Sequence, residues 1–140
     1  MKLLTAIAFF LAAAKAEAGC EELAGKYRGV ADEAYSSDFS RAEFGITERG
    51  GGARISLWPD GSDQPRRLDI ILDGQEHPGD GAYTGKSYVA FCEEGALTVR
   101  ASFPEQPDPL LYYFYEEEAE LKLVNAVGSY SRLTGRFTRL

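Results

Sequence analysis

The stretch ALTVRASF, residues 96–103, decides the fold class of this 140-residue chain. Its side chains alternate strictly: Leu97, Val99, Ala101 and Phe103 are apolar, while Thr98, Arg100 and Ser102 are polar. A period of two is typical of a β-strand with one face in a core and the other in water. Residues 93–95 (Glu-Glu-Gly) join this stretch to another β-prone run at 83–92, so the two runs are predicted to form a hairpin.

Similar short runs lie on both sides of this hairpin, separated by Gly, Asp and Pro. In Arg66–Asp73 the apolar face consists of Leu68, Ile70 and Leu72, and Ile71 breaks the alternation. Further strands are predicted from Tyr27 onward at 41–48, 53–58, 110–115, 119–125 and 129–139, with a helical turn at 20–26 and turn-rich sequence at 74–81. The pattern predicts an all-β, antiparallel up-and-down meander of eight or nine strands that closes into a small barrel.

The first 18 residues have the composition of a cleaved secretory signal. Lys2 precedes an apolar run from Leu3 to Ala14, and residues 16–18 (Ala-Glu-Ala) place small residues where a signal peptidase cuts. The run is shorter than the roughly 20 apolar residues that a membrane-spanning helix needs. We therefore expect a signal helix at 1–18, one domain at 19–140 and a periplasmic or secreted protein, with a retained anchor or lipidation of Cys20 as alternatives.

The two cysteines and the net charge restrict the partners further. Cys20 and Cys92 are predicted to form a disulfide, because an even number of cysteines in an exported chain usually pairs; two free thiols are the alternative. The net charge of −7 disfavours nucleic acids and anionic membranes and suits a basic partner.

Two short segments carry a resemblance to a known family. Residues 25–27 (Gly-Lys-Tyr), after a helical turn, resemble the lipocalin start, where Gly-x-Trp opens the first strand. Residues 130–133 (Tyr-Ser-Arg-Leu) resemble the end of those barrels, and 72–99 is similar to small secreted bacterial lipocalin-like proteins of unknown function. The resemblance implies a calycin-type barrel that holds a small apolar ligand. It also implies that Arg132 closes the barrel by packing on Tyr27, with Arg136 and Arg139 as alternatives.

The run at 110–115 (LLYYFY) is apolar on both of its faces. A half-exposed strand would be apolar on one face only, so one face is expected to fill the core and the other to meet a second layer, a partner or a ligand. Packing of both faces inside the protein is an equal alternative, and the pattern does not say which face points inward. The predicted ligand-binding residues are Phe103, Tyr112, Tyr113, Phe114 and Tyr115.

Catalytic chemistry has no clear signature in this sequence. The single histidine, His77, lies in a turn-like segment, where Glu76, His77 and Asp80 make a weak metal signal. No Gly-x-Ser-x-Gly motif is present, and the acidic groups at 93–94 and 116–120 are typical of solvated turns rather than calcium loops. We predict neither an enzyme nor a cofactor or metal site. The expected function is binding of a small apolar ligand in the barrel interior. The alternative is an envelope interaction module or inhibitor that binds a basic protein through its acidic outer surface.

Overall fold

The computed structural model describes residues 19–46, 51–81 and 84–140, so the predicted signal peptide lies outside the described residues. A short 3-10 helix precedes ten strands: η1 (Gly19–Leu23), β1 (Gly25–Gly29), β2 (Phe39–Ile46), β3 (Gly52–Pro59), β4 (Arg66–Ile71), β5 (Glu76–Gly81), β6 (Gly85–Glu93), β7 (Ala96–Ser102), β8 (Leu110–Glu117), β9 (Glu120–Val127) and β10 (Tyr130–Arg139). None of the helices in these ranges is long and apolar enough to cross a membrane.

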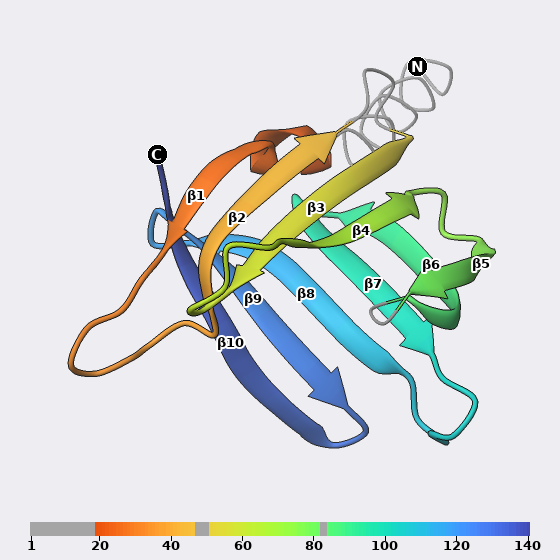
Figure 1. Cartoon of the computed structure of the whole chain (residues 1–140). Coiled ribbons are helices and arrows are strands. Elements are labelled where there is room, and N and C mark those ends of the chain that lie inside the picture. Colours follow the sequence, from red (N-terminus) through yellow and green to blue (C-terminus); the bar gives the residue numbers. More distant parts are fainter. Residues whose placement is uncertain (1–18, 47–50, 82–83) are drawn as a thin grey trace, which may run out of the picture.

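All ten strands form one antiparallel sheet that curls into a barrel (Figure 1). The order β4-β3-β2-β1-β10-β9-β8-β7-β6-β5 means that strands adjacent in the chain pair with each other, and β1 pairs with β10. Within the described strands the ring is interrupted only between β4 and β5, which stand at the two ends of the order; we call this gap the seam. The predicted up-and-down meander is confirmed, but it has ten strands rather than eight or nine.

The strand β5 was not predicted, because residues 74–81 have the composition of a turn. The segment contains Pro78 and two glycines within Glu76–Gly81, and these are poor strand formers. It is nevertheless extended by pairing with β6, through Glu76 with Val89 and His77 with Tyr88. A proline is tolerated here because β5 has a partner on one side only.

The core lies inside the barrel and consists of the side chains that alternate inward. The predicted inward residues Leu97, Val99 and Ala101 are completely buried. Phe44 on β2 and Phe114 on β8 are four strands apart in the sheet, yet their rings meet edge to face with centroids 5.6 Å apart. The interior is therefore filled by side chains at this level of the barrel.

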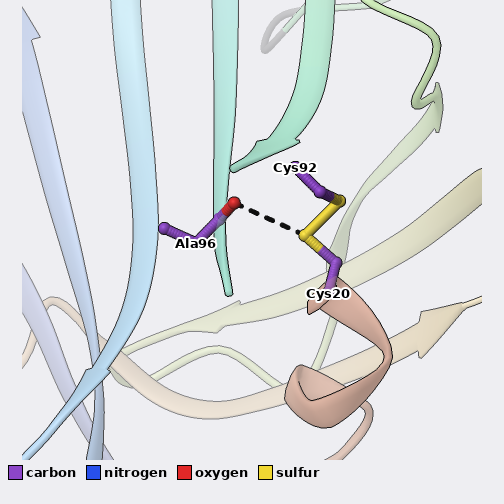
Figure 2. The surroundings of a disulfide bond; sticks show 3 residues. All are labelled: Cys20, Cys92 and Ala96. Atoms are coloured by element: carbon purple, nitrogen blue, oxygen red, sulfur yellow. Dashed lines mark hydrogen bonds between the residues drawn. A yellow bond between two sulfur atoms is a disulfide. The ribbon is translucent and has the colours of Figure 1, made fainter. Parts of the chain in front are cut away.

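One end of the barrel is covered by η1, which the disulfide holds in place (Figure 2). Cys20 and Leu23 of η1 are buried, and Cys20 bonds to Cys92 on β6 with their Cα atoms 5.7 Å apart. The Sγ atom of Cys20 also lies 3.4 Å from the carbonyl oxygen of Ala96, a van der Waals contact because a disulfide sulfur has no hydrogen to donate. The predicted disulfide is confirmed.

Tyr27, two residues into β1, lies beside η1. It is buried, its hydroxyl donates a hydrogen bond of 2.6 Å to the carbonyl of Leu23, and burial raises the pKa of that hydroxyl. The guanidinium of Arg139 lies over the ring, 4.9 Å from its centroid, and donates to the carbonyls of Glu22 and Ala24. A cation over an aromatic face is attracted by the ring quadrupole.

The expectation that Arg132 packs on Tyr27 is therefore wrong, and Arg139 takes this position. Arg132 is seven residues earlier on β10, which corresponds to roughly 20 Å along a strand. It lies at the opposite end of the barrel and forms a salt bridge of 3.1 Å with Asp38. The sequence near both arginines is similar, but only the pairing of β1 with β10 brings Tyr27 opposite Arg139.

Candidate functional site

A hollow of about 560 Å³ opens at the seam of the barrel. Its apolar lining comes from Ile46 on β2, Ala53 on β3, Ile70 and Ile71 on β4, Pro78 on β5 and Tyr88 on β6. Arg54 and Asp69 add an ion pair of 2.6 Å on the outer side. The volume falls within the range of small-molecule sites, about 300–1,000 Å³.

Three local features of the chain leave this space open. β4 and β5 follow one another with only residues 72–75 between them, but they do not pair, so the sheet separates there. Gly45 and Gly52 line the hollow without contributing a side chain. Ile71, which breaks the alternation of its strand, points outward and is 45% exposed. An apolar side chain is thus presented to solvent beside the seam.

Tyr88 links the two sides of the seam. It is buried on β6, and its hydroxyl oxygen accepts a hydrogen bond of 3.0 Å from the backbone N–H of Ile71 on β4. This N–H lies on the edge of β4 that has no neighbouring strand, so the hydroxyl satisfies a donor that the sheet does not. The N–H of Gly74 donates to the carbonyl of Ala90 at 3.0 Å and makes a second link to β6.

His77 belongs to the same region, on β5 rather than in the loop that its sequence predicted. Its Nε2 atom lies 2.9 Å from both carboxylate oxygens of Asp73, and its ring centroid lies 5.7 Å from that of Tyr88. The pKa of Asp73 is lowered, chiefly by the backbone N–H of Gln75 and then by His77. The bond to Asp73 fixes the orientation of the imidazole beside the hollow.

The weak metal signal around His77 finds no support in this geometry. His77 is paired with Asp73, and the side chain of Asp80 lies outside the description. Among the side chains that are described, no group of three or more His, Cys, Asp or Glu is arranged to hold a metal ion.

Replacing Tyr88 by phenylalanine is expected to lower the free energy of unfolding by about 1–2 kcal/mol, because the N–H of Ile71 loses its acceptor. Chemical denaturation measures the loss, and amide exchange should show faster exchange at Ile71. Tyr113→Phe removes a hydroxyl from an exposed ring and serves as the control, with a change within about 0.5 kcal/mol. Equal stability of both variants would contradict the role of the Tyr88 hydroxyl.

The five predicted ligand-binding residues lie elsewhere. Tyr112 and Phe114 point inward and are buried, Phe103 is half-buried against the same core, and Tyr113 and Tyr115 lie on the outer face of β8. The inward face of 110–115 is thus the one that carries Tyr112 and Phe114. None of the five lines the seam hollow, and their role in ligand binding stays a prediction. The sequence signal for the hollow was the break in alternation at Ile71.

Three solved structures have the same fold over most of their length. They are the secretory abundant heat soluble protein 4 from Ramazzottius varieornatus (10% identity, 84% of this chain and 94% of that chain, TM-score 0.61), the lipid binding protein 8 from Caenorhabditis elegans without ligand (12%, 86% and 96%, 0.64), and a point mutant of the fluorescent protein UnaG (11%, 85% and 96%, 0.64).

Comparison of the sequence finds less. No protein-family model and no curated protein matches the chain. The TM-scores of 0.61–0.64 establish the shared architecture. Sequence identities of 10–12% carry no information on the residues of a site. The chain has a calycin-type β-barrel fold.

Proposed function

We propose that this protein binds a small amphipathic ligand whose apolar part lies in the seam hollow. The observation that carries the proposal is the hollow itself, about 560 Å³ of space whose lining combines apolar side chains with the ion pair of Arg54 and Asp69. The rings of Phe44 and Phe114 fill the barrel centre at their level, so the seam offers room that this part of the interior does not. Similarity to a structure named as a lipid binding protein supports the proposal.

The lining limits the chemistry of this ligand. Ile46, Ile70 and Ile71 favour an aliphatic or aromatic body, because burial of apolar surface drives the binding. The polar group of the ligand would lie at the rim, next to the ion pair of Arg54 and Asp69, where hydrogen bonds to water are kept. Binding without catalysis fits a site whose polar groups are few and already paired.

We also propose that this binding takes place outside the cytoplasm. The disulfide between the buried Cys20 and the half-buried Cys92 supports a periplasmic or secreted protein, because disulfides persist in oxidising compartments.

The test places a side chain in the hollow. Ile46 is half-buried and belongs to the apolar lining of the hollow, so Ile46→Trp enlarges a side chain that already lies there. We expect this variant to bind the fluorescent probe 1-anilinonaphthalene-8-sulfonate at least about tenfold more weakly than the native chain, since the ring fills the apolar space. Fluorescence titration measures the affinity, and native mass spectrometry of purified protein reports any retained ligand.

Thr138→Trp is the matched control, because it adds the same ring to an exposed strand position that does not line the hollow. It should bind the probe as the native chain does. Unchanged binding by Ile46→Trp would place the probe elsewhere and would contradict the proposed site.

A further inference from the structure

The outer face of β1–β4 carries a concentration of positive charge. Strand pairing sets Arg28 beside Arg41 and Trp58 in one row, and Lys26 beside Glu43, Ser56 and Arg67 in the next. A third row sets Arg54 beside Asp69. We call the exposed cations of these rows the basic face: Lys26, Arg28, Arg41, Arg54 and Arg67.

This face differs in sign from the chain as a whole. It has five of the 15 Lys and Arg residues but only two of the 22 Asp and Glu residues, Glu43 and Asp69, so its local net charge is +3 in a chain of net charge −7. Lys26, Arg28 and Arg67 form no salt bridge with any described residue. The expectation that the chain avoids anionic surfaces rested on net charge, which does not describe this face.

The individual contacts on the basic face leave most of its charge available. Arg54 is the exception, because Asp69 neutralises it across a 2.6 Å bond. The guanidinium of Arg41 lies 4.0 Å from the ring centroid of Trp58 and keeps its charge. Asp60 and Asp63, in the turn after β3, lie beyond one end of the face and bound its positive potential there.

A second hollow, of about 270 Å³, lies within the basic face. Its lining consists of Gly25, Lys26, Glu43, Phe44, Gly45, Arg54 and Ser56. Lys26 and Ser56 contribute an ammonium and a hydroxyl, donors that a phosphate oxygen accepts from, whereas Arg54 is paired with Asp69 and the carboxylate of Glu43 opposes an anion.

We propose that the basic face docks on an anionic phospholipid bilayer, with a head-group phosphate in the hollow beside Lys26. The cations are spread over four strands on the outer wall of the barrel, an arrangement that suits the many separate phosphate charges of a bilayer surface. A protein that binds a nucleic-acid strand usually has a positively charged groove that follows the strand instead. Each Lys or Arg at such a surface strengthens binding about fivefold, and Trp side chains favour the lipid interface. Charges on the far wall are screened beyond roughly 8 Å at physiological salt.

The experiment measures co-sedimentation of the purified chain with vesicles. We expect at least about tenfold stronger binding to phosphatidylcholine vesicles with about 30% phosphatidylglycerol than to phosphatidylcholine alone at about 0.1 M salt, with loss of the difference at about 0.5 M. Arg28→Gln with Arg67→Gln should weaken binding to the anionic vesicles about tenfold or more, and Glu43→Gln should strengthen it about fivefold.

The control pair is Lys86→Gln with Arg100→Gln, on β6 and β7, which removes the same net charge from exposed positions outside the basic face. It should bind as the native chain does. Equal weakening by both pairs would show a response to net charge alone and would overturn the proposal, as would equal binding to the two kinds of vesicle. We would also add poly-glutamate or duplex DNA at a charge concentration equal to that of the anionic lipid. Release of the chain from the vesicles under these conditions would overturn the proposal in favour of another polyanion. Probe binding in the seam hollow is a separate readout.

Discussion

Removing the disulfide by Cys20→Ala with Cys92→Ala is expected to lower the free energy of unfolding by about 4 kcal/mol. The bridge joins residues 72 apart in sequence, and a loop of this length restricts the unfolded chain strongly. In the folded protein the same bond holds η1 on the end of the barrel, where Leu23 is buried beside it. Without the bond, only packing and the contacts of Tyr27 and Arg139 keep this helix in place.

Urea unfolding and thermal melting measure the effect, and a loss of this size corresponds to a melting temperature lower by roughly 10–20 °C. The native chain after reduction with dithiothreitol is the control, because it loses the cross-link but keeps both sulfur atoms in the core. It should be destabilised almost as much as the double variant. A reduced chain as stable as the oxidised one would show that the cross-link adds nothing.

The strands could be predicted from the sequence where apolar and polar residues alternate strictly. Leu97, Val99 and Ala101 face inward because a strand with this pattern has only one way to bury its apolar side. β5 was not predictable in the same way, since its residues have low strand propensity and adopt the extended form by pairing with β6. The extended form of this segment thus depends on its neighbour.

The seam hollow depends on which strands fail to pair, and that is decided by the whole ring. Ile71 was visible as an exception to the alternation, but nothing near it indicates that Tyr88, on another strand, supplies a hydrogen bond to its backbone. Arg132 and Arg139 lie on the same strand, and only the register of β1 with β10 decides which of them meets Tyr27. Local patterns give the direction of a side chain, whereas its contact depends on register.

The charge of the basic face also depends on strand pairing rather than on the local sequence alone. The alternation around Lys26, Arg28 and Arg67 indicates that they point outward, but their collection on one wall follows from the successive pairing of β1, β2, β3 and β4. The net charge of −7 averages this wall with acidic turns elsewhere on the chain. A sum over the sequence therefore predicts solubility and long-range repulsion, while docking depends on the local sign.

Phe114→Ala is expected to lower the free energy of unfolding by about 3–5 kcal/mol. Phe114 is 1% exposed, and its ring meets Phe44 from another part of the barrel wall, so truncation removes contacts on both sides of the interior. The rigid strands around it prevent collapse, and the space left behind adds a cavity term to the lost burial. Chemical denaturation of the variant and the native chain measures the difference.

Tyr113→Ala is the matched control for this substitution, since it truncates the adjacent ring on the outer face of β8, where 36% of the residue is exposed. We expect a loss of about 1 kcal/mol there. The Phe114 variant should also gain binding of benzene, because apolar cavities of this kind stay dry and accept apolar molecules. A loss near that of Tyr113→Ala, with benzene bound by the native chain as well, would mean that the ring borders existing space. The ligand would then belong in the barrel interior, beside the predicted residues Tyr112 and Phe114, rather than at the seam.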